Sequence, residues 1–289
     1  MEILSLSPAA KAWLQETRIA HVLHVFDPVC NLINDEGEVL SLVDARVGNG
    51  PFSAVVARGG FTDWVSAHSG VLLSPPVLMV GDGIFKYFQA KLWMPQPDWT
   101  ALREELDGLQ KASKNVQVLL SRHAEAESFA WLMMPDSDQA TYGNAVFERA
   151  KQAIGELLRA LMEENIEAMR AAASQLAGLG SGLTPAGDDV LVGMMHALWA
   201  TRPEVQALAL SLVLAEAAAP RTNSLSAAWL LAAGRGEAGE AWHELFAAIA
   251  AKDAGAQEAA VMRILPTGHS SGADALGGFA AMIQMEAQA

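Results

Sequence analysis

The stretch GLGSGLTPAGDDVLVG, from Gly178 to Gly193, decides how the C-terminal half of this chain folds. Its first five residues include three glycines, which allow positive φ angles and close approach of the backbone to a neighbour. Thr184 and Pro185 then supply the N-cap and first-turn residues that begin helices. We therefore expect a helix to begin at Pro185, with Thr184 as its N-cap and a charge-free glycine loop in front of it.

Two acidic residues, Asp188 and Asp189, follow in this predicted helix. The lysine of a GxxxxGK[ST] phosphate loop is absent, yet the first-turn N–H groups and the helix dipole still favour an anionic ligand. With Thr184 as N-cap, neither aspartate stands where a capping box would place it. At least one carboxylate must then face packed protein and needs a cation, a ligand amide or an arginine as partner. The alternative is that both only complement the helix dipole.

A second stretch, GHSSGADALGGF from Gly268 to Phe279, repeats part of this pattern. The spacing G-x-D-x-L-x-G occurs in both stretches, beginning at Gly187 and at Gly272. Glycines one turn after each aspartate remove side chains where another backbone or a ligand would approach. We therefore expect both helix starts, with Asp189 and Asp274, to meet at one cavity. The S-x-x-D spacing of the second stretch favours an alternative, a purely structural capping box.

A third stretch, APRTNSLSAAWLL from Ala219 to Leu231, contains an arginine in front of three consecutive N-cap candidates. Arg221 has no acidic neighbour between residues 217 and 236. An arginine beside the exposed N–H groups of a helix start suits a phosphate or a carboxylate. The alternative is an ion pair between Arg221 and a distant surface acid.

These stretches together define the candidate site. We expect catalytic residues at Asp189, Asp274 and His269, the last being the titrating side chain nearest the second helix start. The predicted binding residues come from all three stretches: Gly180, Ser181, Gly182, Thr184, Gly187, Asp188, Arg221, Thr222, Asn223, Ser270, Ser271 and Gly272. No metal ligand is predicted and no cofactor is required, although carboxylate oxygens would accept Mg²⁺ or Mn²⁺.

Outward from these motifs, the periodicity divides the chain into two regions. From Tyr142 onward Ala, Leu and Glu recur at helical spacing, which predicts helices at 142–177, 185–201, 204–218, 223–233, 239–250, 255–264 and 272–287. From His21 to Phe88, β-branched and aromatic runs are separated by turn residues, as in NDEGE at 34–38. Connections this short favour mostly antiparallel strands.

Between the two regions, DWTALREELDGLQK at 98–111 predicts a helix and NVQVLLS at 115–121 a last strand. MMPDSDQ then breaks the pattern near residue 135. The predicted fold class is α+β: a mostly antiparallel β-rich domain at 1–135, with peripheral helices, followed by an all-α bundle at 136–289 that carries the glycine-rich motifs.

Composition excludes several classes of partner. The 289 residues are 52% hydrophobic and 18% charged, enough to bury a sizeable core. A net charge of −14 repels nucleic acid and anionic membrane surfaces, and neither a signal peptide nor a membrane span is predicted. The single cysteine, Cys30, lies in an apolar strand pattern and suits a reducing compartment. We expect a cytoplasmic protein that binds a small anion.

The motifs resemble those of the AllH-like family, which includes the smallest subunit of bacterial oxamate carbamoyltransferase. The resemblance rests on GLGSGLTPAGDD at Gly178–Asp189, RTNSLS at Arg221–Ser226 and GHSSGADALGG at Gly268–Gly278, with a weaker element at Gly50–Val56. It implies a part in the phosphorolysis of oxalurate to oxamate and carbamoyl phosphate, or the reverse, during allantoin nitrogen catabolism. It also implies a hetero-oligomer with two larger subunits.

In that reaction the resemblance implies that Arg221 and the Gly178–Gly187 loop bind phosphate. Asp189 and Asp274 would orient the amide, with His269 in proton transfer. Two alternatives stay open. One is an Mg²⁺- or Mn²⁺-dependent hydrolase that uses paired aspartates at helix starts, similar to ADP-ribosylglycohydrolases. The other is a non-catalytic structural or regulatory subunit whose cleft completes the active site of a partner.

Overall fold

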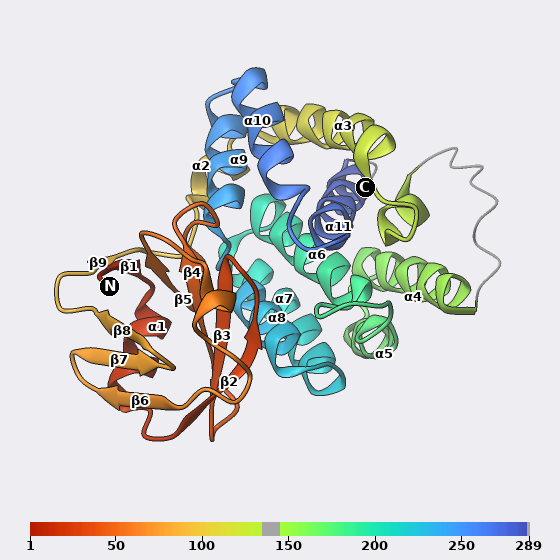
Figure 1. Ribbon diagram of the computed structural model, residues 1–289. Helices are drawn as coiled ribbons and strands as arrows, with labels where there is room; N and C mark the ends of the chain where they lie inside the picture. Colours follow the sequence, from red (N-terminus) through yellow and green to blue (C-terminus); the bar gives the residue numbers. More distant parts are fainter. Residues whose placement is uncertain (135–144, 288–289) are drawn as a thin grey trace. The chain divides into compact units, whose positions relative to one another are not determined.

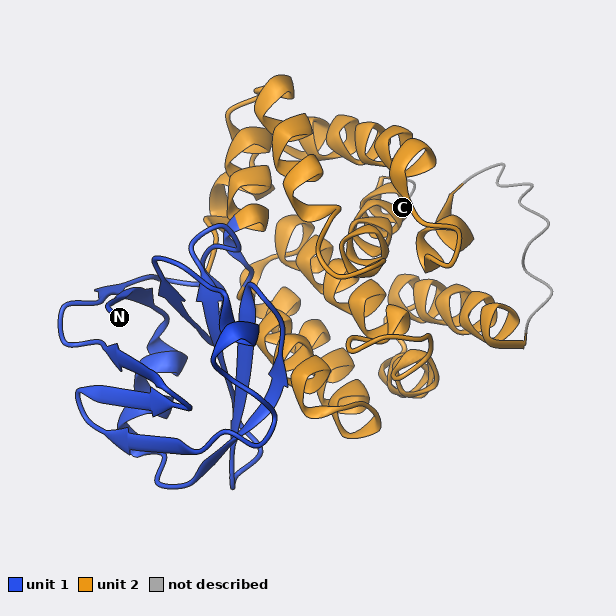
Figure 2. Ribbon diagram, viewed as in Figure 1, with its two compact units in different colours: residues 1–95, 238–240 blue, residues 96–237, 241–289 orange. Residues whose placement is uncertain are grey.

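The computed structural model describes residues 1–134 and 145–287 (Figure 1). Contacts between residues divide the chain into two compact units (Figure 2). Unit 1 comprises Met1–Pro95 and Ala238–Glu240, and unit 2 comprises Gln96–Glu237 and Ala241–Ala289. Unit 1 is built mostly of strands and unit 2 of helices, which confirms the α+β fold class.

Unit 1 contains two sheets and one α-helix, α1 (Pro8–Glu16). The larger sheet has the strand order β2-β3-β4-β5-β1-β9 and the smaller one β6-β7-β8. The strands are β1 (Ile3–Leu6), β2 (Ala20–Val25), β3 (Val29–Asn34), β4 (Val39–Asp44), β5 (Ser53–Val56), β6 (Val71–Ser74), β7 (Val77–Val80), β8 (Gly83–Lys86) and β9 (Lys91–Leu92).

Most strand pairs in unit 1 are antiparallel, as the short connections predict. The turn at 34–38 joins β3 to β4 as a hairpin, and Gly37 adopts a φ of 82° there, which suits a residue without a side chain. The β4–β5 and β1–β9 pairs are parallel instead. For β4 and β5 the connection is the non-helical segment 45–52, which is long enough to return along the sheet. The sequence patterns also missed β1.

Cys30 lies in β3 and is fully buried. Burial in apolar surroundings raises the pKa of its thiol to about 12, because the charged thiolate is poorly solvated there. Cys30 is therefore an inert core residue, as its apolar neighbours predict.

Unit 2 is built around α6 (Ala186–Thr201), which packs along α11 (Ser271–Glu286). Almost every residue of α6 is buried, so its hydrophobic pattern has no solvent face. The other helices surround this pair (Figure 1). They are α2 (Trp99–Arg103), α3 (Leu106–His123), α4 (Ala145–Met162), α5 (Ile166–Leu176), α7 (Glu204–Ala218), α8 (Ser224–Gly234), α9 (Glu240–Ala250) and α10 (Ala254–Ile264), with the 3-10 turns η2 (Phe129–Met133) and η3 (Ala219–Arg221).

Three predictions about the helices need correction. The single helix expected at 142–177 is two helices, since the chain turns at Glu164 with a φ of 51° and Asn165 caps α5. The strand expected at 115–121 is wrong, because these residues lie inside α3, where they bury one helical face. The helix expected at 98–111 is interrupted between α2 and α3.

The domain boundary predicted at 135/136 falls outside the described residues and stays a prediction. Residues 96–134 pack with the helices of unit 2, since α3 and η2 both contact α11. Among the residues that the structure describes, none of the helices is long and apolar enough to cross a membrane.

Candidate functional site

The two helices at the centre of unit 2 cross where both lack side chains. A Cβ atom on Gly193 would lie 1.8 Å from the backbone oxygen of Ala275. A Cβ atom on Gly278 would lie 2.2 Å from the backbone oxygen of Val190. Real side chains do not fit at such distances, so the glycines permit α6 and α11 to cross with their backbones in contact. The two repeated motifs therefore pack against each other, while a shared cavity at Asp189 and Asp274 stays a prediction.

Each helix also begins against the end of the helix before it. A Cβ atom on Gly187 would lie 2.1 Å from the oxygen of Leu176, the last residue of α5. A Cβ atom on Gly272 would lie 2.1 Å from the oxygen of Ile264, the last residue of α10. The pairs α5–α6 and α10–α11 therefore share one packing scheme, at matching positions of the G-x-D-x-L-x-G pattern.

The helix starts differ by one residue from the predicted ones. Helix α6 begins at Ala186 with Pro185 as N-cap, and Thr184 lies one residue earlier. The Thr184 hydroxyl instead shares a hydrogen bond of 2.7 Å with the Ser271 hydroxyl, which links the two motifs directly. Helix α11 has Ser270 as N-cap and no side-chain cap, so the capping box expected there does not form.

Asp274 is completely buried. Its Oδ1 accepts hydrogen bonds from the Ser128 hydroxyl and the Phe129 N–H, both at 2.6 Å. Its Oδ2 is buried and has no hydrogen-bond partner among the described residues. Burial raises the pKa of Asp274 to about 6, although the hydrogen bonds to Ser128 and Ser270 oppose this.

Asp189 stands at the matching position of α6 and is partly exposed. Burial raises the pKa of its carboxyl well above the ordinary value, and repulsion by Asp274 raises it further. Hydrogen bonds from the hydroxyls of Ser271 and Thr184 act in the opposite direction. Its Oδ2 is buried and, like that of Asp274, lacks a partner among the described residues. Burial thus favours the protonated form of both carboxyls, and repulsion by Asp274 adds to this effect at Asp189.

Asp188 holds the glycine loop and the third motif together. Its Oδ1 accepts the Gly178 N–H at 2.9 Å, and its Oδ2 accepts the Thr222 hydroxyl at 2.5 Å. The carboxyl is almost fully buried, and desolvation raises its pKa despite these hydrogen bonds. Asn223 adds a second link, since its Nδ2 donates to the Leu183 oxygen while its Oδ1 caps α8 at the Ser226 N–H.

The glycine loop itself is open to solvent. Ser181 and Gly182 are exposed, and Gly180 and Gly182 have φ angles of 105° and 116° that side chains rarely adopt. A Cβ atom on Gly180 would also lie 2.8 Å from the Ala186 nitrogen. The loop is thus a glycine-dependent turn beside the start of α6.

Arg221 is exposed and lines a cleft of about 580 Å³. The other lining residues come from α4, from the end of α5 and from the Pro220–Thr222 segment: Arg149, Ser174, Gln175, Ala177, Pro220 and Thr222. Arg149 and Ser128 are the polar residues that the sequence patterns missed. Ser128 donates to Asp274 and Arg149 lines the cleft with Arg221, and both are brought there by the tertiary fold, so no local spacing could indicate them.

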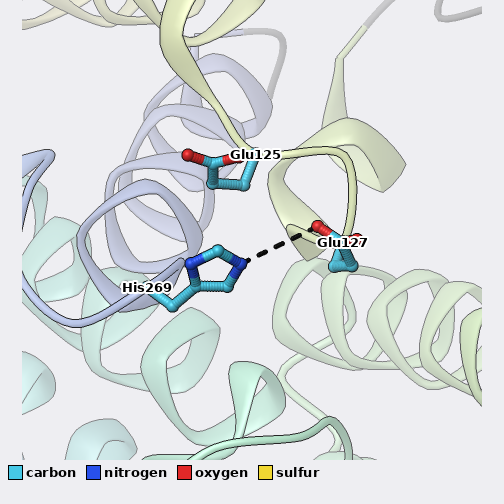
Figure 3. A group of neighbouring side chains, drawn as sticks. All are labelled: Glu125, Glu127 and His269. Carbon is cyan, nitrogen blue, oxygen red and sulfur yellow. Dashed lines mark ion pairs between the residues drawn. The ribbon is translucent and has the colours of Figure 1, made fainter.

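His269 directly precedes Ser270, the N-cap of α11, and its side chain is exposed. Its side chain is 75% exposed, and its Nε2 lies 3.9 Å from an oxygen of Glu127 (Figure 3). Glu125 lies in the same exposed group. Within the described residues, this is the only set of three carboxylates or imidazoles with ligand atoms within 4.8 Å of one another. No contact of His269 with Asp189 or Asp274 is found there, and its catalytic role stays a prediction.

The arginines near the strand ends of unit 1 have a structural explanation in one case. Arg46 forms two side-chain hydrogen bonds with the buried carboxylate of Asp44, at 2.9 and 3.1 Å. These bonds, together with the N–H of Gly59, hold the pKa of Asp44 below its usual range. Arg46 therefore fixes the loop after β4.

Fold and site together define a two-unit α+β protein whose helical unit carries a polar site at two paired helix starts. Residues 176–283 match the family model described as oxamate carbamoyltransferase subunit AllH, and residues 2–90 match the AllH family N-terminal domain. The chain belongs to the AllH family, as the motifs predict. No curated protein and no solved structure matches the chain.

Proposed function

We propose that this chain is a subunit of a carbamoyltransferase that interconverts oxalurate plus phosphate with oxamate plus carbamoyl phosphate in the cytoplasm. The family description supplies the reaction class and the multi-subunit assembly. The observation that carries the proposal is the pair Asp189 and Asp274, each with a buried carboxyl oxygen at a helix start that has no hydrogen-bond partner among the described residues. Unpartnered carboxylate oxygens need N–H donors, and a carbamoyl group presents them.

The phosphorolysis of oxalurate forms a bond between a phosphate oxygen and the carbamoyl carbon. It breaks the bond from that carbon to the nitrogen that becomes the amide of oxamate, and this nitrogen takes up a proton. Asp189 supplies the proton, because burial and repulsion by Asp274 raise the pKa of its carboxyl and favour the protonated form. Asp274 is held by Ser128 and Phe129, so its second oxygen is fixed in direction and accepts a carbamoyl N–H.

The phosphate lies on the other side of Asp188, at the RTN segment. Arg221 provides the positive charge, and the start of α8 immediately after Asn223 provides N–H groups and the positive end of a helix dipole. Asp188 holds Thr222 against the glycine loop and thereby fixes the distance between the phosphate region and the aspartate pair.

The test is an assay of carbamoyl phosphate formation from oxalurate and phosphate, with the chain combined with the two larger subunits expected as partners. We expect turnover with the wild-type chain and a decrease in kcat of about a hundredfold or more for Asp189→Asn, since the asparagine cannot donate the proton. Asp107→Asn is the control, because Asp107 is an exposed residue of α3.

Absence of turnover in the assembled complex would overturn the proposal, as would an unchanged kcat for Asp189→Asn. Thermal unfolding gives a second readout on the chain alone. Phosphate or carbamoyl phosphate is expected to raise the unfolding temperature, and Arg221→Ala is expected to remove that shift. A shift that persists in Arg221→Ala would exclude Arg221 as the phosphate ligand.

A further inference from the structure

We infer that the cleft between α4, the end of α5 and η3 is a phosphate-group site in which Arg149 and Arg221 act together. This inference rests on the proposed function for the identity of the anion, and it assigns a second cationic ligand, Arg149, that no motif contains. The cleft has a volume of about 580 Å³, which exceeds the size of a phosphate group and leaves room for the rest of a small substrate.

The charges in the cleft have one sign. Of its lining residues two are arginines, and none is acidic. The guanidinium groups of Arg149 and Arg221 form no hydrogen bond or ion pair with any described residue. Two like charges are thus placed at one concave surface of a protein whose net charge is −14. Positive charges on a concave surface attract an anion and raise its local concentration there.

Other arginines of unit 2 show the contrast. Arg170, Arg202 and Arg235 each lie within 4.0 Å of a glutamate carboxylate. Acidic partners are abundant in this chain, with 33 Asp and Glu against 19 Lys and Arg. Arg159, also in α4, has no such partner among the described residues either, so what distinguishes Arg149 and Arg221 is that both line one cleft without an acidic residue.

The uncharged polar groups of the cleft define which donors are available to a ligand. The Ser174 hydroxyl donates to the Ala217 oxygen and the Thr222 hydroxyl donates to Asp188, so both are already used. Gln175 and the two guanidinium groups remain, next to the start of α8. Guanidinium groups with several N–H donors match the oxygens of a phosphate, which favours a phosphate group over a singly charged carboxylate.

The experiment is an isothermal titration of the full-length chain with inorganic phosphate, with the ionic strength held constant by sodium chloride. We expect saturable binding to one site. Arg149→Gln and Arg221→Gln are each expected to weaken the affinity about ten- to hundredfold, since each removes charge-assisted hydrogen bonds to the anion. Arg159→Gln is the matched control, because Arg159 is an exposed arginine of α4 outside the cleft. The phosphate affinity of this variant should equal that of the wild-type chain.

Three results would overturn the inference: no saturable binding, an unchanged affinity for Arg149→Gln, or an equal loss for Arg159→Gln, which would show an effect of net charge alone. Oxamate as titrant separates phosphate from carboxylate ligands. The inference predicts oxamate affinity at least about tenfold weaker than that of phosphate, because oxamate carries one charge. Equal or tighter binding of oxamate would contradict the assignment of a phosphate group.

This titration needs neither partner subunits nor a carbamoyl acceptor, so its failure is distinguishable from failure of the proposed function. An assembled complex without turnover would refute the function while Arg149→Gln still weakens phosphate binding. Conversely, a complex that turns over with unchanged kinetics in Arg149→Gln would refute the cleft assignment alone.

Discussion

The helix pairs α5–α6 and α10–α11 have the same backbone arrangement and different polar groups. In both, a glycine near the helix start packs against the last carbonyl of the preceding helix, and an aspartate two residues later has an oxygen without a partner in the described part of the chain. Only α6 has a second aspartate next to this one, Asp188, which fixes the glycine loop to Thr222. Ala273 takes the corresponding place in α11 and is buried. The repeated glycines set the packing, and Asp188, found only in α6, connects that helix to Thr222 in the cleft lined by Arg149 and Arg221.

Removing the shared packing should have the largest effect. Gly193→Val and Gly278→Val would each place atoms inside the backbone of the opposite helix, so we expect loss of the folded state. Gly193→Ala should destabilise unit 2 by more than about 3 kcal/mol. The measurement is urea unfolding followed by circular dichroism.

Gly155→Ala in α4 is the matched control for these glycines. A Cβ atom there meets nothing within 4 Å, so this substitution should stabilise the helix by about 0.5–1 kcal/mol. If Gly193→Ala were as well tolerated as Gly155→Ala, close backbone packing could not explain the glycine pattern.

Asp274, the buried aspartate of α11, should make the free energy of unfolding depend on pH. We expect this effect to be smaller than that of the glycine substitutions. Because the folded-state pKa of Asp274 is raised from 3.8 to about 6, its protonated form is favoured in the fold, and stability is lost as pH rises through about 4 to 6. Between pH 5 and pH 8 this group should lower the free energy of unfolding by about 1–2 kcal/mol. Asp274→Asn should remove that part of the decrease, and an identical pH slope in the variant would contradict the assignment.

The hydrogen bonds from Gly178 and Thr222 to Asp188 have no counterpart at Ala273 in α11. We expect them to contribute about 1–3 kcal/mol to the free energy of unfolding. Asp188→Ala removes the acceptor for Gly178 and Thr222, and Thr222→Val removes one donor. The double variant should be less destabilised than the sum of the single ones, by about 1 kcal/mol, because both remove the same hydrogen bond. Strict additivity in urea unfolding would show that Asp188 and Thr222 do not interact in solution.

Loss of the hydrogen bond between Thr184 and Ser271, which joins the starts of α6 and α11, should have the smallest effect on stability. Thr184→Val or Ser271→Ala breaks the hydrogen bond between the two hydroxyls, which we expect to cost about 0.5–1.5 kcal/mol. Both hydroxyls also lower the pKa of Asp189, so either change should raise that pKa further. Titration of Asp189 followed by ¹³C NMR measures this, and a downward change would contradict the arrangement of hydroxyls around Asp189.

Much of the helical unit could be predicted because local sequence signals mark where its helices begin and end. The starts and ends of α7, α8 and α9 follow from capping residues and periodicity, and most lie within one residue of their predicted positions. The strand expected at 115–121 failed because β-branched residues on one face of a helix look like a strand over a short window. Parallel pairing of β4 with β5 depends on tertiary contacts that no short connection indicates.

The site could be predicted in part for a related reason. Glycines and aspartates at fixed spacing indicated that the two helix starts meet, since that packing depends on the residues of the motifs themselves. Ser128 and Arg149 lie in other elements and reach the site only through folding, so no spacing could reveal them. His269 adjoins α11 in sequence, yet its side chain points to Glu127 at an exposed surface. Sequence distance alone does not give the direction of a loop side chain.

The meeting of the two helix starts at one pair of coupled carboxylates is tested most directly by the titration of Asp189. Its carboxyl pKa should be measured by ¹³C NMR in the wild-type chain and in Asp274→Asn. Because repulsion by Asp274 raises the pKa of Asp189, we expect a lower pKa for Asp189 in the variant, still above the ordinary value owing to burial. An unchanged pKa in a folded Asp274→Asn chain would contradict a shared site.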